Sequence, residues 1–584
     1  MQLLYIWIKK YTCLENANLN FCENFRFSYN DKNNKLIVTQ DKQNNASLFP
    51  LKINNFTEDS CIDNISVIVG SNGAGKTSIC RFLYTLYFYH NNIPGYIIIY
   101  KIDNTIYITS DLNPDISDLN KILDSNTLFD LNKLQIQKKS LEEHCSFNML
   151  FYSPIYNDKH PFQTPIETYA DVNSLFKDVS TTYTLNHDIE IYKNKTTGVE
   201  YTDNIKEFTA HRILDNNRIA TFISYFLHIE TNIELGITLP KFVYFTYDEN
   251  AITLFDQECN VNNIENLILN ELSSKINQNN KKEFFIDKIS LVIYCTFCRT
   301  FTLNQKFGYG EILQKEYKNI LSEYNYKNND KSISQHVLDI LSLCSNEIFK
   351  EGGLWINFIN QIKNLDEKHF ESGYLKLNLK TEAKLFCFLN ALYQRMSYIY
   401  DFGEFEFNPT LSSGEYSELL IYSRLLYGIS EIAESNKNKE FLLFLDETEI
   451  TLHPRLQQHL IKNLINFLND IYLDQGYKFQ IILATHSPIV LSDLPKDNVI
   501  FLQKLPGETK SIVKELPENK NTFAASIYEL YKDSFFIDTT TTGSFAKEII
   551  NSSIKINNKE IREYIIDLIG DKFLKGFIMG DFEK

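Results

Sequence analysis

The sequence predicts an α/β protein with a mixed or parallel sheet, a largely helical insert and a helical C-terminal tail. Short apolar or alternating segments, typical of strands, occur before residue 155 and again between residues 401 and 505. Between these two parts, apolar residues recur three and four positions apart, as in amphipathic helices. Strands that alternate with helices form a parallel sheet. We therefore expect a first sheet lobe at 1–155, a mostly helical insert at 156–400, a second sheet lobe at 401–505 and a helical tail at 506–584.

The expected elements follow from the apolar pattern in chain order. The first lobe is expected to contain strands at 3–8, 35–39 and 66–70, a helix at about 76–90, and strands at 96–100, 105–109 and 148–153. The insert is expected to contain helices that include residues 218–229, 284–301 and 383–396. The second lobe and the tail are expected to contain a helix after Ser413, a strand at 441–446, a helix from Pro454, strands at 479–485, 499–504 and 511–516, and then helices.

Composition excludes several classes of protein. With 584 residues, 43% of them hydrophobic, the chain is too apolar for a disordered protein and long enough for more than one domain. A net charge of −16 argues against a protein that coats nucleic acid over its whole surface, because phosphate contacts come from Lys and Arg. The longest apolar run, at 289–297, is shorter than a membrane-spanning helix, and Lys9 and Lys10 follow the first apolar segment too soon for a signal peptide. We expect a soluble cytoplasmic protein with no membrane partner.

The ten cysteines are scattered, and the expectation is reduced thiols rather than a metal site. Cys295 and Cys298 are the close pair, but they lie in an apolar helix-like segment without a second pair. A zinc site takes about four ligands.

A glycine-rich loop is the strongest local motif. It fits the pattern G-x-x-x-x-G-K-[ST] and lies after an expected strand and before an expected helix. Glycines let backbone N–H groups turn toward phosphates, and the helix N-terminus favours negative charge. Within the loop, Lys76 is expected to reach the outer phosphates and Thr77 to offer its hydroxyl to Mg²⁺. The predicted ATP-binding residues are Gly70, Ser71, Asn72, Gly73, Ala74, Gly75, Lys76, Thr77 and Ser78.

Two acidic residues end the expected strand at 441–446. A central parallel strand has little reason to end in paired carboxylates unless they face a cation or a reacting water. Asp446 is expected to complete the Mg²⁺ environment through water, and Glu447 to polarise the water that attacks the γ-phosphate. The alternative is that the acids only mark the solvent end of the strand.

A second candidate phosphate-binding surface lies about 30 residues earlier, at the start of a helix. It consists of Ser412, Ser413, Gly414 and Glu415, which follow Leu411. One subunit has no use for two such surfaces on one γ-phosphate. The segment LSSGE resembles the LSGGQ signature of ABC-type ATPases, and the resemblance implies that it contacts ATP bound to the loop of a second copy. Taken alone, these residues also fit a serine-rich helix cap.

A histidine follows the expected strand at 479–485. His486 can sense the γ-phosphate and orient the attacking water from this position. In the segment ATHSP it resembles the switch histidine of the same superfamily. A structural histidine is the alternative.

Together with Glu449, Leu452, His453 and Pro454, these motifs resemble the DEPExxLHP and ATHSP patterns of prokaryotic AAA-15/AAA-21 ATPases, relatives of RecF and of the OLD-family nucleases. The resemblance covers residues 1–155 and 400–505 and implies an ABC/RecF-type P-loop ATPase head that uses ATP and Mg²⁺. The sequence departs from the pattern at Thr448, where proline is usual. It also contains no convincing Q-loop glutamine, and Ser153 occupies the equivalent segment. Both departures keep a non-catalytic nucleotide sensor open as an alternative.

The C-terminal segment suggests a biological setting. Residues 521–550 resemble the tail of ATPase subunits in Septu-type and retron-linked anti-phage systems, and the resemblance implies a separate HNH-type nuclease or toxin partner. The Glu and DxD cluster of a TOPRIM nuclease is not found after His486, so no intrinsic nuclease is expected. We expect a defence ATPase that self-associates through ATP-sandwiched heads.

Other functions remain open at this point. The main alternative is a RecF-like DNA repair ATPase that acts directly on DNA, with DNA or RNA contacts on the helical insert. An ATPase subunit of a membrane transporter is disfavoured by the long insert ahead of the LSSGE segment.

Overall fold

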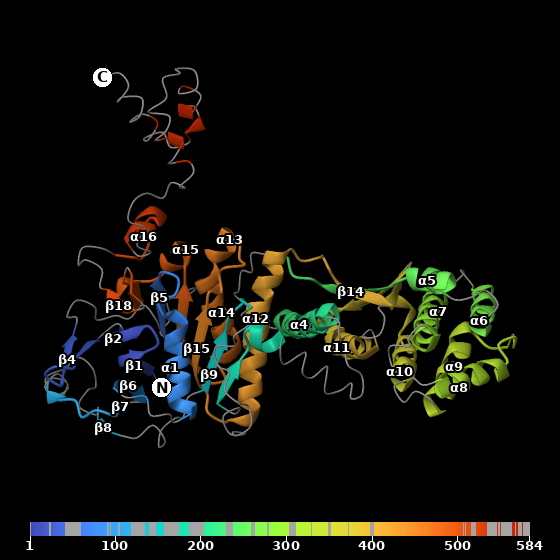
Figure 1. Cartoon of the computed structure of the whole chain (residues 1–584), viewed down its shortest axis with the longest axis horizontal. Coiled ribbons are helices and arrows are strands. Elements are labelled where there is room, and N and C mark those ends of the chain that lie inside the picture. Colours follow the sequence, from blue (N-terminus) through green and yellow to red (C-terminus); the bar gives the residue numbers. More distant parts are fainter. Residues whose placement is uncertain are drawn as a thin grey trace.

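The computed structural model forms an elongated molecule with a sheet-containing head at one end and a largely helical arm at the other (Figure 1). The residues it describes are 2–22, 25–40, 60–89, 93, 95–102, 105–117, 135–138, 148–156, 175–185, 204–228, 238–258, 263–276, 280–302, 311–328, 330–347, 352–371, 373–396, 402–505, 507–508, 510–514, 521–533 and nine single positions from 546 to 575.

The strands of the described residues form three sheets. Their bounds are β1 Gln2–Tyr11, β2 Leu14–Asn20, β3 Phe25–Asn30, β4 Lys35–Gln40, β5 Ile62–Gly70, β6 Tyr96–Ile102, β7 Thr105–Ser110, β8 Gln135–Lys138, β9 Asn148–Tyr152, β10 Phe176–Asp178, β11 Phe242–Tyr247, β12 Phe370–Glu371, β13 Tyr374–Asn378, β14 Gly403–Asn408, β15 Glu440–Asp446, β16 Lys478–Thr485, β17 Val499–Lys504 and β18 Ser511–Lys514. The head contains a 12-stranded sheet in the order β10-β9-β15-β16-β5-β17-β18-β2-β1-β6-β7-β8, and β3 pairs with β4 beside it.

The described helices cover the sheet and build the arm. Their bounds are α1 Lys76–Tyr89, α4 Asn204–His228, α5 Asn250–Glu258, α6 Ile264–Ser273, α7 Lys281–Thr302, α8 Glu311–Glu323, α9 Ile333–Glu347, α10 Gly352–Lys363, α11 Leu379–Met396, α12 Ser413–Ser435, α13 Pro454–Gln457, α14 Leu460–Tyr472, α15 Pro488–Leu491 and α16 Ile527–Asp533. None of the helices in the described ranges is long and apolar enough to cross a membrane.

The six strands from β10 to β17 in this order are parallel to their neighbours, which confirms the expected α/β fold class. Strands β5, β15 and β16 are buried along almost their whole length and are mainly apolar toward their carboxyl ends, as is typical of parallel strands covered on both faces. Alternate residues of these strands pack into two separate clusters, one with α1 and the other with α12 and α14. The pairing of Asp446 with Ala484, and of Ala484 with Ile68, brings the carboxyl ends of the three strands to one edge. Ligands of such sheets bind outside this edge.

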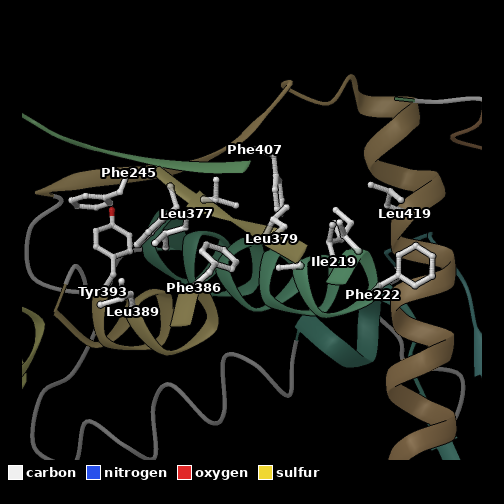
Figure 2. Packing of buried hydrophobic residues seen from close by; sticks show 14 of the residues in the cluster. Ile219, Phe222, Phe245, Leu377, Leu379, Phe386, Leu389, Tyr393, Phe407 and Leu419 are labelled. Carbon is white, nitrogen blue, oxygen red and sulfur yellow. The ribbon is translucent and has the colours of Figure 1, made fainter. Parts of the chain in front are cut away.

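The arm is joined to the head by continuous apolar packing. Helices α4 and α11 lie side by side under a four-stranded sheet, ordered β12-β13-β11-β14. Phe222 of α4 faces Leu419 of α12, and Phe386 of α11 lies below Phe407 of β14 (Figure 2). These side chains belong to the same buried cluster as the head residues under β15 and β16. The arm is therefore not separated from the head by a gap in the core.

Several elements differ from the sequence prediction. Strands β2 and β3 were not expected; only β1, β4 and β5 were predicted before the glycine-rich loop. The helix expected from Pro454 is divided into α13 and α14, because Gln458 and His459 lie between them. Strand β10 lies in the segment expected to be mostly helical and extends the main sheet. Most of the tail from residue 534 onward lies outside the described residues, so the helices expected there stay predictions.

Candidate functional site

The glycine-rich loop connects β5 to α1, as expected, and its glycines are required by the backbone. Gly73 and Gly75 have φ angles of 73° and 98°, a region that residues with a Cβ rarely adopt. A Cβ on Gly75 would also lie 2.6 Å from Sγ of Cys13. Inside the loop, the N–H of Ala74 donates to the carbonyl of Ser71 at 3.1 Å. The loop is thus a tight turn that leads directly into the N-terminus of α1.

A cavity of about 400 Å³ opens against this loop. Its lining combines the loop, the first turn of α1, the β1–β2 turn and the end of β15, from which it takes Cys13, Asn72, Gly73, Gly75, Lys76, Thr77, Ser78 and Glu447. Six of the nine predicted ATP-binding residues are in this lining. The other three, Gly70, Ser71 and Ala74, shape the loop without lining the cavity. Its volume is within the range of small-ligand sites.

Thr77 and Asp446 meet at the inner end of the site. Oγ1 of Thr77 donates to Oδ2 of Asp446 at 2.6 Å. The other carboxylate oxygen, Oδ1, is buried and has no hydrogen-bond partner among the described residues. Burial, opposed by the Thr77 hydrogen bond, raises the pKa of Asp446 to about 6. Mg²⁺ prefers oxygen ligands such as a hydroxyl and a carboxylate oxygen that has no other partner. Thr77 and Asp446 therefore fit the predicted ion.

Lys76, Glu447 and His486 converge on the same point. Nζ of Lys76 lies 2.6 Å from Nε2 of His486, and Oε1 of Glu447 lies 3.3 Å from that same nitrogen. Nε2 accepts from Lys76 when the ring proton is on Nδ1, and it donates to Glu447 when Nε2 itself is protonated. The contact with His486 lowers the pKa of Glu447, and the charge of Lys76 acts in the same direction against burial. Burial lowers the pKa of Lys76. A γ-phosphate that enters here would compete with His486 for the lysine.

The backbone of Glu447 is itself unusual. Its φ angle is 52°, in the left-handed region that disfavours non-glycine residues. Its N–H donates to the carbonyl of Ala484 at 2.8 Å, and its own carbonyl accepts from Ile450 at 3.2 Å to close a turn. The strained turn directs the carboxylate into the cavity.

The LSSGE segment begins α12 and forms a complete capping box. The Ser412 hydroxyl and N–H both donate to Oε2 of Glu415, at 2.7 and 2.8 Å, and the N–H of Glu415 donates back to the Ser412 hydroxyl. The side chains of Ser412 and Glu415 therefore hydrogen-bond to each other within the helix cap. Ser413 is exposed and has no hydrogen-bond partner among the described residues. None of the four predicted signature residues lines the cavity of its own chain.

Ser153 lies where the missing Q-loop residue was expected. It follows β9 directly, and Tyr152 at the end of that strand pairs with Leu445 of β15. The Ser153 hydroxyl accepts from the N–H of Ile155 at 3.3 Å. The segment therefore follows a strand that pairs with the strand ending in Asp446, and it carries a short hydroxyl at this point.

Sequence reasoning missed two residues beside the loop. Cys13 lines the cavity from the β1–β2 turn, and Nζ of Lys504 lies 3.8 Å from the position that a Cβ on Gly73 would take. The exposed Lys504 forms no ion pair with the described residues. Both residues reach the loop through pairing of strands that are distant in sequence, so no local sequence motif predicts their contact with the loop.

Thr448 carries a hydroxyl that the turn does not use. Its side chain is 1% exposed, and Oγ1 has no hydrogen-bond partner among the described residues. Thr448→Val removes this buried hydroxyl at almost constant volume, and we expect the protein to gain about 1 kcal/mol of stability. Thermal unfolding should show a higher melting temperature for Thr448→Val and no change for Thr451→Val, at an exposed position of the same segment. An unchanged or lower melting temperature for Thr448→Val would contradict the assignment.

Glu418 is a buried acid one turn into α12. Its side chain is 2% exposed, and Oε1 accepts a long 3.4 Å hydrogen bond from Nδ2 of Asn463. Burial, opposed by that hydrogen bond, raises the pKa of Glu418 to about 7. The folded form therefore holds the proton more tightly than the unfolded chain, so stability is present at low pH and is lost as the pH rises toward 7.

Glu418→Gln should abolish this loss. We expect the variant to melt about 2–5 °C above the unmodified protein at pH 8.5 and at nearly the same temperature at pH 5. Glu434→Gln, an exposed position on the same helix, is the control and should leave both melting temperatures unchanged. Equal shifts at the two pH values would contradict a buried, titrating carboxyl.

Comparison with known proteins agrees with this geometry. The family model AAA-15, described as an AAA ATPase domain, matches residues 47–491. This span covers about three quarters of the chain and includes the glycine-rich loop, the whole insert, the acidic strand and the His486 segment. No curated protein matches the chain.

Proposed function

The chain belongs to the AAA-15 family of AAA ATPase domains, and we propose that it hydrolyses ATP between two copies of its head to control a separate effector protein. Nucleotide binding and ATPase activity follow from the family. The composite site, the effector and the defence role are the proposal. The observation that supports it is the signature segment, in which Ser412 and Ser413 are exposed and none of the four residues lines the cavity of its own chain.

Each residue at the cavity has a different role in the proposed hydrolysis. Lys76 binds the outer phosphates once it exchanges His486 for phosphate oxygens. Thr77 and Asp446 would hold Mg²⁺, which neutralises charge on the phosphates. Glu447, whose lowered pKa keeps it ionised near neutral pH, accepts a proton from the attacking water. His486 lies beside both Lys76 and Glu447 and orients that water.

The second copy supplies the donors that this cavity lacks. Ser413 and Gly414 lie at the N-terminus of a 23-residue helix, where free N–H groups and the helix dipole favour an anion. Because Ser412 and Glu415 satisfy each other, Ser413 is the side chain that is free to bind a phosphate oxygen. A Cβ on Gly414 would lie 3.8 Å from Cδ1 of Leu456 and 3.9 Å from the carbonyl of Thr451, so the signature lies beside the segment that follows Glu447. In the proposed dimer, the signature and the segment that follows Glu447 would face the second copy together.

The proposed setting is bacterial anti-phage defence, with a separate nuclease or toxin as the effector. It is supported by the resemblance of residues 521–550 to the ATPase subunits of Septu-type and retron-linked systems. The long arm offers a surface distinct from the ATP site for such a partner (Figure 1). The net charge of −16 counts against extensive nucleic-acid contacts by the ATPase itself.

The test is the composition of the complex in its ATP-bound form. Tagged Glu447→Gln protein is purified from its native host with ATP and Mg²⁺, and everything that co-purifies is identified and quantified by mass spectrometry. Lys76→Ala serves as the matched control that lacks bound ATP. A nuclease or toxin that is stoichiometric with Glu447→Gln supports the proposal.

Recovery of the ATPase alone, or with nucleic acid only, would contradict the proposed effector. The RecF-like alternative would then gain support if DNA stimulates ATP turnover and this stimulation falls with salt.

A further inference from the structure

Glu449 is a buried acid that the proposed mechanism does not use. It lies two residues after Glu447 and is 4% exposed. One of its oxygens, Oε1, accepts two hydrogen bonds from the loop that carries the histidine: from Oγ1 of Thr485 at 2.6 Å and from the backbone N–H of His486 at 2.9 Å. A single carboxylate oxygen thus links the turn after β15 to the end of β16.

Gln457 adds a second link between the same two loops. Its Nε2 donates to the carbonyls of Glu449 and Leu452, at 3.2 and 2.9 Å, and its Oε1 accepts from the Ser487 hydroxyl at 2.7 Å. The backbone bond from the N–H of Glu447 to the carbonyl of Ala484 is a third link. The catalytic turn and the histidine loop are therefore joined by hydrogen bonds on both sides of His486.

The position of His486 depends on these links. Its ring reaches Lys76 and Glu447 through one nitrogen, while its backbone N–H is bonded to Glu449. A shift of about 1 Å in a catalytic group can cost about 100-fold in rate. Loss of the Glu449 contact would free the histidine backbone and the Thr485 hydroxyl at once.

The contacts of Glu449 indicate what its side chain must provide. Both hydrogen bonds end on Oε1, and Oε2 has no hydrogen-bond partner among the described residues. Burial raises the pKa of this carboxyl. An amide oxygen accepts the same two bonds, so the negative charge is not needed for them.

We propose that Glu449 is a positioning residue for ATP hydrolysis, and that its Oε1 fixes the backbone of His486 so that the imidazole faces Lys76 and Glu447. The inference rests on the role proposed above for His486. It adds a residue that does not line the cavity and that acts through the loop carrying the histidine.

The test compares Glu449→Ala, Glu449→Gln, His486→Ala and the double variant Glu449→Ala/His486→Ala in the full chain. For Glu449→Ala we expect kcat to fall about 10–100-fold, with the Kd for ATP within about twofold of the unmodified protein. Glu449→Gln should retain kcat within about threefold, because its carbonyl oxygen replaces Oε1. The double variant should be no slower than His486→Ala, because a positioning residue has nothing left to position.

A second variant guards against a folding defect. Thr485→Val removes one donor to Oε1, and with it the acceptor for the N–H of Ser487, without an empty space. We expect a smaller loss of kcat in the same direction with an unchanged Kd for ATP. Independent, multiplicative losses in the double variant would overturn the inference, and so would a normal kcat in Glu449→Ala when His486→Ala is slow. An unchanged kcat in His486→Ala would instead overturn the role proposed for His486, and this inference with it.

Discussion

Glu447→Gln is expected to reduce steady-state ATP hydrolysis by about 100- to 10,000-fold while ATP still binds. Glu447 lines the cavity and is ionised at neutral pH, because the contact with His486 lowers its pKa further below neutral, whereas an amide cannot accept the proton of the attacking water. The side chains have nearly the same size, so the strained turn at φ 52° is kept. Phosphate release measures hydrolysis, equilibrium binding of ATP measures affinity, and size-exclusion chromatography with ATP should show the variant trapped as a closed dimer.

Lys76→Ala provides the contrast. Lys76 is nearly buried and lies against His486, so its removal takes away the cation in the cavity that can bind outer phosphates. This variant should lose ATP binding and remain monomeric with ATP. Wild-type turnover by Glu447→Gln would show that another group acts as the base and would contradict the assignment.

The head could be predicted from the sequence because its motifs are local. The glycine-rich loop, the paired acids after a buried strand and the histidine after the next strand each need only a few consecutive residues. Parallel pairing then brings them to one edge, and the register of Asp446 with Ala484 confirms this. Thr77 was singled out in the glycine-rich loop and Asp446 at the end of the acidic strand, and the structure brings these two residues into hydrogen-bond contact.

The features that the sequence did not predict depend on contacts between distant parts of the chain. Cys13 reaches the cavity because the β1–β2 turn lies against Gly75, and Lys504 reaches the loop because β17 pairs with β5. A local pattern carries no information about either pairing. Strand β2 was missed because LENANLN alternates only weakly, and its place depends on antiparallel pairing with β1. The sequence also could not show that the capping box occupies the side chains of Ser412 and Glu415 within the predicted signature, because both residue types are also expected in a phosphate-binding signature.

Ser413→Arg is expected to abolish ATP hydrolysis and leave ATP binding to the isolated chain unchanged. The exposed Ser413 does not line the cavity of its own chain, so a bulky cation at this position should leave that cavity intact. It should block only the approach of this segment to the phosphates bound by a second copy. Mixing resolves the geometry, because a hybrid of Ser413→Arg with Lys76→Ala contains one site with an intact loop and an intact signature. If single sites turn over independently, an equal mixture should recover up to about a quarter of wild-type hydrolysis, although each variant alone is inactive. Wild-type hydrolysis by Ser413→Arg alone would refute a site shared between two copies, since the same residue would then have no phosphate to contact.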